Sequence, residues 1–219
     1  MKAPEGWRPV RAARLQRLAV LVLLVAWAAL LVWPMALLAQ TPAAAAPYRA
    51  ELTRAAHLHW GLDAPVAALA AQVHQESGWR PQAVSHVGAQ GLAQFMPATA
   101  KWWCELHGLS ALDCQPANPT WALRALAGYD RWLFDRAPPQ YAPRERIWVA
   151  LRAYNGGLGH WQAERRVALA AGRPDTPAAV DAACGQARRA ALHCAENLGY
   201  PHRILNVLQP RYASWGAGL

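Results

Sequence analysis

The stretch that decides the fold runs from residue 76 to residue 100 and reads ESGWRPQAVSHVGAQGLAQFMPATA. Four apolar residues precede it at helical spacing: Val66, Leu69, Ala70 and Val73. This spacing predicts a helix that begins near Pro65, with Asp63 as its cap and Gly78 as its stop. The sequence therefore predicts a helix that ends on an acid, Glu76, beside a glycine-rich loop.

Glu76 falls at the edge of the apolar face and in the last turn of this predicted helix. Partial burial and the negative end of the helix dipole both oppose ionisation, so we expect the pKa of Glu76 to be raised. A carboxyl that keeps its proton near neutral pH is suited to general acid catalysis. The alternative is a structural one, in which Glu76 bends out to solvent or pairs with an arginine.

Helical signals continue along the rest of the chain, and no stretch alternates as a half-buried strand does. Further helices are expected at 97–108, 118–133, 143–154, 158–171, 177–192 and 202–213. A short Pro/Ala spacer occupies residues 40–47. We therefore predict one mainly α domain over residues 48–219.

Three separated motifs give this domain a family resemblance. They are the Glu76-Ser77 pair, the string GLAQFMP at 91–97, and AYNGG at 153–157. Together they resemble the soluble lytic transglycosylase family, whose fold is like goose-type lysozyme, over about residues 51–212. The resemblance implies a lyase that cleaves the β-1,4 bond between N-acetylmuramic acid and N-acetylglucosamine in peptidoglycan. It implies no cofactor.

In that family the glutamate matching Glu76 is the single catalytic acid and then the base. It protonates the glycosidic oxygen and afterwards takes the proton of the muramoyl C6 hydroxyl, which closes on C1 to form a 1,6-anhydro sugar. One carboxyl suffices for this reaction, whereas ordinary glycosidases use two.

The resemblance also assigns residues to the sugar site. The implied substrate-binding residues are Ser85, Gln94, Met96, Tyr154, Asn155 and Glu196. The Tyr154 hydroxyl is expected near the catalytic carboxyl, and Asn155 is expected to order the turn. Structural alternatives stay open: Ser85 as a turn cap, Met96 as core filler, Tyr154 as a packed aromatic and Glu196 as a surface acid.

The chain departs from the family pattern at three positions. Ala93 stands where the family commonly has Met, and Gly156 where it commonly has Ala. Glu196 and Tyr200 occupy the place of a late Glu-to-Tyr motif, but Pro201 follows where the family helix continues unbroken. None of these changes removes a reactive group, although the first two bear on the depth of the cleft.

Four cysteines are present in the 219-residue chain. In an exported domain they indicate disulfides, and two local bridges, Cys104–Cys114 and Cys184–Cys194, are the simplest of the three connectivities. The eight histidines are scattered, without a recognised metal-ligand spacing, so no metal site is predicted.

The N-terminus indicates export. Residues 1–17 are basic, and an uncharged apolar run follows at 18–39, long enough to cross a bilayer. It is predicted to be a transmembrane anchor or a cleaved signal sequence, with the domain anchored to the periplasmic face of the inner membrane or released after cleavage.

The charge balance, 22 Lys plus Arg against 13 Asp plus Glu, suits a solvated basic surface or attraction to an anionic polymer. Nucleic acid is not expected as a partner of an exported domain. The expected partners are peptidoglycan strands, the inner membrane and, on size and anchoring alone, a secretion or conjugation complex. The competing functions are a hydrolytic muramidase, which needs a second acid, and a non-catalytic peptidoglycan-binding module.

Overall fold

A computed structural model describes residues 40–218, and the expected segments 1–17 and 18–39 lie outside this range. Among the described residues, no helix is both long enough and apolar enough to span a membrane. The expectation for residues 18–39 therefore stays a prediction.

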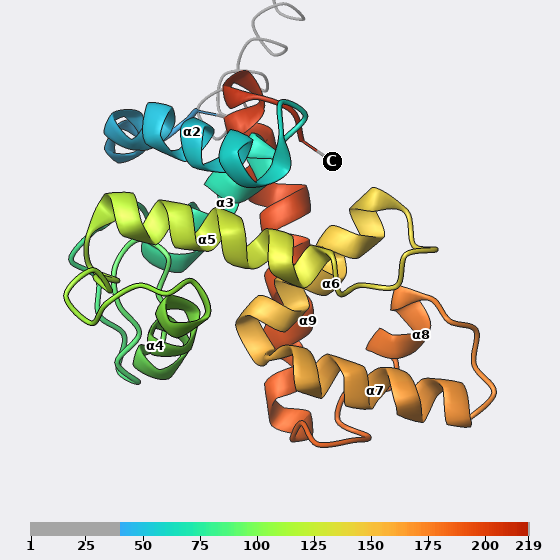
Figure 1. Cartoon of the computed structure of the whole chain (residues 1–219). Helices are drawn as coiled ribbons and strands as arrows, with labels where there is room; N and C mark the ends of the chain where they lie inside the picture. The colour runs from blue at the N-terminus through green and yellow to red at the C-terminus, as the bar shows by residue number, and fades with distance from the viewer. Residues whose placement is uncertain (1–39, 219) are drawn as a thin grey trace, which may run out of the picture. The chain divides into compact units, whose positions relative to one another are not determined.

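The mainly α prediction is confirmed for the part of the chain that the structure describes (Figure 1). Its longer helices are α2 (Arg49–Trp60), α3 (Val66–Ser77), α4 (Pro97–Leu106), α5 (Pro119–Phe134), α6 (Pro143–Gly156) and α7 (Leu158–Ala170). Shorter elements are η1 (Ala43–Tyr48), α8 (Pro177–Asp181), η2 (Ala191–His193), α9 (Cys194–His202), η3 (Arg203–Leu208) and η4 (Gln209–Trp215). Within residues 40–218, strand pairing is limited to isolated bridges, Val84 with Gln90 and Gln90 with Phe95.

Helix α3 is buried from Val66 to Val73 and again at Ser77, and its polar residues His74, Gln75 and Glu76 are half-buried. Gly78 ends it in the left-handed conformation, with φ of 60°. The predicted cap is wrong: Asp63 is exposed, Pro65 precedes the helix, and no side chain caps its first turn. Buried apolar contacts, rather than a cap, therefore hold the start of α3.

Residues after 200 hold both ends of α3. The Ala67 amide donates to the Ala217 carbonyl at 3.1 Å. Beyond the other end, the buried Trp79 indole donates to the Tyr212 hydroxyl at 2.6 Å. Trp79 has φ of 66°, an uncommon conformation for a bulky residue, which requires such surrounding contacts.

Helices α5 and α6 were correctly placed by their start signals. The Asn118 side chain accepts from the Thr120 and Trp121 amides, and a proline opens each helix. Helix α5 packs against α2 and α6. Figure 1 shows α4 and its loops on one side, α7 and α8 on the other, and α9 between them.

The expected helix at 177–192 is wrong beyond Asp181, where α8 ends. The Cys184–Cys194 disulfide closes a loop there, and Gly185 has φ of 78°, which an α-helix does not accommodate. Both expected disulfides are present; the other joins Cys104 to Cys114.

The expected helix at 202–213 is instead a π-helix, η3, followed by the 3₁₀ helix η4. Pro201 lies inside α9 and does not break it. Proline has no N–H to donate to the carbonyl four residues earlier, and the wider π turn continues the helix directly after α9. The late motif therefore stays on helical backbone despite Pro201.

Candidate active site

Glu76 lies in the last turn of α3 and is half-buried. The Tyr200 hydroxyl, from α9, donates a hydrogen bond to its Oε1. Burial raises the pKa of Glu76 to about 7, the nearby Glu196 adds to that rise, and the Tyr200 bond opposes it. The predicted direction of the shift is confirmed, with burial as its main cause. Glu76 thus has the protonation behaviour of a general acid at neutral pH.

Tyr154 brings the AYNGG motif at 153–157 against the GLAQFMP string at 91–97. Its hydroxyl donates to the Ala93 carbonyl at 2.6 Å, and its ring meets Phe95 edge-on, with centroids 5.9 Å apart. The charge of Glu76 contributes to a raised pKa of Tyr154, after the larger effect of burial. Tyr154 therefore lies within electrostatic reach of the acid, while Tyr200 makes the direct bond.

The glycine-rich loop is held by its own side chains. Gln94, with φ of 49°, donates its Nε2 to the Ala83 carbonyl at 3.1 Å and to the Gly91 carbonyl at 2.9 Å. Ser85 Oγ accepts from the Ala89 amide at 3.0 Å, which is the turn-cap arrangement. Gly91 has no room for a side chain, because a Cβ there would lie 2.1 Å from the Pro116 carbonyl oxygen.

Met96 is not core filler, because 40% of its surface is exposed at the start of α4. A long, flexible apolar side chain in this position is available to contact a ligand. Gln94 and Met96 thus lie in the same loop as Ala93, whose carbonyl accepts the hydrogen bond from Tyr154.

Asn155 and Glu196 line a separate pocket of about 440 Å³. Asn155 Oδ1 accepts from Asn197 Nδ2 at 2.8 Å, which ties the end of α6 to α9. Glu196 is exposed on α9, and its charge reaches Glu76. Glu196 is therefore within electrostatic reach of Glu76, and Asn155 lines the same pocket as Glu196.

Asp130 of α5 lies in no recognised sequence motif, yet the structure shows it to be a second buried acid, 1% exposed. Its Oδ1 accepts from Gln72 at 3.3 Å, and its Oδ2 has no partner among the described residues. Burial and the charge of Glu76 hold the pKa of Asp130 well above its usual range. The available signal was its spacing, since Asp130 shares a helix face with the buried Leu126 and Leu133.

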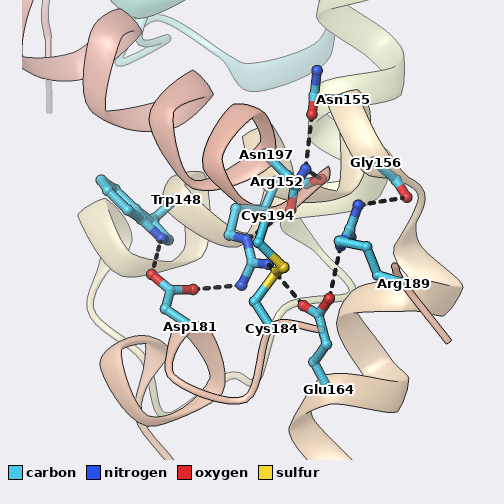
Figure 2. Close-up of polar contacts among 10 residues, drawn as sticks. All are labelled: Trp148, Arg152, Asn155, Gly156, Glu164, Asp181, Cys184, Arg189, Cys194 and Asn197. Carbon is cyan, nitrogen blue, oxygen red and sulfur yellow. Dashed lines mark hydrogen bonds and ion pairs between the residues drawn. A yellow bond between two sulfur atoms is a disulfide. The ribbon is translucent and has the colours of Figure 1, made fainter. Parts of the chain in front are cut away.

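Sequence reasoning missed a buried ion cluster behind the pocket (Figure 2). Arg152 of α6 is fully buried and pairs with Glu164 of α7 at 2.7 Å and with Asp181 at 2.5 Å. Its Nε also donates to Asn197 Oδ1 of α9 at 3.0 Å. Arg152 thereby joins four helices around the end of α6.

The described residues contain no group of three or more His, Cys, Asp or Glu side chains arranged to hold a metal ion. The site offers a carboxyl with a raised pKa, a tyrosine bonded to it, and a second tyrosine within electrostatic reach.

Residues 51–173 match the family model of the Transglycosylase SLT domain, which covers more than half of the chain. The chain belongs to this family. The resemblance drawn from the three motifs is thus confirmed. The late segment with Tyr200 lies beyond the matched residues, so its place beside Glu76 comes from the structure alone.

Among curated relatives, membrane-bound lytic murein transglycosylase F of Maricaulis maris is 38% identical over 105 residues, covering 48% of this chain and 21% of that protein. The protein of the same name from Pasteurella multocida is 36% identical over 105 residues, covering 48% and 20%. The chain thus spans about a fifth of the length of these SLT relatives.

Solved structures share the fold. The 70-kDa soluble lytic transglycosylase of Escherichia coli aligns with a TM-score of 0.55 and 24% identity, over 75% of this chain and 24% of that one. An inactive variant of lytic transglycosylase Slt from Pseudomonas aeruginosa gives a TM-score of 0.57 and 24% identity, over 78% and 25%. These alignments support the lysozyme-like SLT fold for the described domain.

Proposed function

We propose that the protein is a peptidoglycan lytic transglycosylase, with Glu76 as general acid and then base. The observation that carries this proposal is the environment of Glu76: a half-buried carboxyl with a pKa of about 7, bonded to Tyr200. The names of the SLT relatives, which describe lytic murein transglycosylases, support the same activity.

The proposed reaction uses one carboxyl in two steps. Protonated Glu76 donates to the bridging oxygen as the bond from that oxygen to the muramoyl C1 breaks. The muramoyl C6 hydroxyl then bonds to C1, and its proton passes to the Glu76 carboxylate, which restores the acid. Because nucleophile and electrophile belong to one sugar, the ring closure has the advantage of an intramolecular reaction.

Two other acids, Asp130 and Asp113, are candidates for the second acid of a hydrolase. A hydrolytic muramidase needs a second carboxylate that activates water. Asp130 is buried and its pKa is well above the usual range, so it lacks both the charge and the access to water. Asp113 lies in the Cys104–Cys114 loop, where Ser110 donates to it at 2.6 Å. Neither residue is placed to serve as the second acid.

The decisive experiment is product analysis by mass spectrometry after digestion of purified sacculi. The expected products end in 1,6-anhydromuramic acid, and the Glu76→Gln variant is expected to release none. Exclusively reducing ends would make the protein a muramidase. Equal digestion by the parent and by Glu76→Gln would exclude the catalytic assignment, and binding without any turnover by the parent would indicate a peptidoglycan-binding module.

We further propose that the enzyme works at the periplasmic face of the inner membrane, held by residues 18–39. The apolar run in the sequence and the name of the membrane-bound relatives support this placement. Membrane fractionation and N-terminal sequencing test it, and a mature protein that begins after residue 39 would exclude the anchor. We also propose that the enzyme opens the cell wall for a secretion or conjugation complex. Co-purification of such a complex with the protein tests this role.

A further inference from the structure

The Cys184–Cys194 loop places Arg189 against the end of α6 (Figure 2). Arg189 is only 6% exposed. Its Nε donates to Glu164 Oε1 at 2.7 Å, and its Nη1 donates to the Gly156 carbonyl at 3.4 Å. Its Nη2 is buried and has no hydrogen-bond partner in the described part of the protein. A buried charged donor without an acceptor is costly, so this nitrogen requires explanation.

Arg189 lines the 440 Å³ pocket together with Asn155, His160, Arg188, His193 and Glu196. His160 Nδ1 is a second buried polar atom that has no partner within residues 40–218. Two nitrogens at one pocket thus lack partners, and the pocket is large enough for a polar group to enter.

Gly156 makes the space that Arg189 occupies. A Cβ at residue 156 would lie 2.2 Å from Arg189 Nη1 and 2.5 Å from Asn197 Nδ2. Gly156 has ordinary helical geometry, without a positive φ, so the backbone itself does not require glycine. The glycine therefore suits the buried arginine of the disulfide loop.

The pocket adjoins the acid. Asn155 directly follows Tyr154, and Glu196 lies one helical turn before Tyr200, the residue bonded to Glu76. The charge of Glu196, which lines the pocket, reaches Glu76, so the pocket is close enough to the acid to receive a substituent of a sugar bound there. On the muramoyl sugar, that substituent is the lactyl group and its attached peptide.

We propose, on the basis of the function proposed above, that this pocket is a subsite for a carboxylate of the peptide attached to the muramoyl sugar, bound by the guanidinium of Arg189, which lines it. A guanidinium binds a carboxylate more strongly than a neutral acceptor. Arg188 adds a second positive charge at the rim. Glu196, the acid among the lining residues, would repel the anion and so confines it to the Arg189 end.

The test compares peptide-bearing sacculi with the same sacculi after an amidase has removed the peptides. Arg189→Gln and Gly156→Ala are expected to lower kcat/KM on peptide-bearing strands about tenfold or more, the scale of one charged hydrogen bond. The amidase leaves a lactyl carboxylate on each muramoyl sugar but removes every carboxylate of the peptide. On these strands both variants should stay within about twofold of the parent, because the sugar site is unchanged. Equal losses on the two substrates, or no loss on either, would overturn the subsite.

Two controls separate recognition from folding. Arg166→Gln removes a charge from an exposed residue of α7 and should leave both rates unchanged. Because Arg189→Gln takes a partner from the buried Glu164, circular dichroism and melting are measured for each variant. Gly156→Ala keeps every charge, so it tests the subsite even if Arg189→Gln does not fold.

A binding measurement separates this inference from the proposed function. Glu76→Gln protein is titrated by calorimetry with N-acetylglucosaminyl-N-acetylmuramoyl tripeptide, with its carboxylates free or amidated. The free acid should bind about tenfold more tightly, and Gly156→Ala in the same background should abolish the difference. Equal affinity for both probes would overturn the subsite. Carboxylate-dependent binding by a protein that forms no anhydro product would instead refute the proposed function.

Discussion

At the scale of single residues, Glu76 stabilises the protein less when it is ionised. Its pKa is 4.5 in the unfolded chain and about 7 in the folded one, so the folded state holds the proton more tightly. The stabilisation is fully present below pH 4.5 and is lost as the pH rises to about 7. At about 1.4 kcal/mol per unit of pKa, the loss approaches about 3 kcal/mol.

We therefore expect Glu76→Gln to be inactive yet more stable than the parent at pH 8, by an amount that grows by about 2 to 3 kcal/mol between pH 4.5 and pH 8. Urea denaturation at both pH values measures it. The exposed Glu105→Gln serves as the control and should stay within about 0.5 kcal/mol of the parent at each pH. A constant difference between Glu76→Gln and the parent would contradict the raised pKa.

Tyr200 tunes the same carboxyl from the opposite direction. Its hydrogen bond favours the ionised form, so Tyr200→Phe should raise the pKa of Glu76 above about 7. General acid catalysis needs the protonated form, and the alkaline limb of kcat/KM should therefore move to higher pH. The matched control is Tyr141→Phe, whose hydroxyl bonds to Asp175 at 2.8 Å. A limb that stays in place or moves to lower pH would exclude this role.

At the scale of elements, Arg152 joins α6 to α7, α8 and α9. Arg152→Met leaves Asp181 without its cation and the buried Glu164 with Arg189 alone. Breaking a buried pair in this way should lower the free energy of unfolding by about 3 to 5 kcal/mol. Guanidinium denaturation measures the loss, with the exposed Arg166→Met as control. A loss under about 1 kcal/mol would show that the cluster does not hold these helices together.

The start and stop signals of helices were predictable because they are local. Asn118 and the opening prolines of α4, α5 and α6 fix those helices through the first few residues of each. The Ala-rich stretch after 177 was misassigned, because a ten-residue disulfide separation and a left-handed glycine override helix propensity there. Where local sequence patterns failed to predict a helix boundary, contacts between distant segments determine it.

In the candidate site, too, residues within local motifs were predictable, whereas contacts between distant residues were not. Glu76, Gln94 and Tyr154 could be proposed from the sequence because they lie in contiguous motifs. The partners of Arg152 lie 12, 29 and 45 residues away, and no local pattern pairs them. Tyr200 lies 124 residues from Glu76, so its bond to the acid required the folded chain.

At the scale of the whole molecule, the excess of Lys and Arg over Asp and Glu favours contact with an anionic wall polymer. Binding of the Glu76→Gln protein to sacculi should fall as sodium chloride rises, because salt screens surface charge. Pelleting of sacculi with the bound protein measures it, with chitin as a neutral polysaccharide control. Binding that is independent of salt would leave the basic charge without a role in attachment.

The contacts that hold α3 make this helix depend on the last part of the chain. A nascent polypeptide that has reached residue 173 already contains Glu76, Gln94 and Tyr154, but not Tyr200, Tyr212 or Ala217. Without them, the hydrogen bonds at both ends of α3 and at the Glu76 carboxyl are absent. A chain that ends before residue 194 therefore lacks the contacts that hold α3 at both ends and that bond to the Glu76 carboxyl.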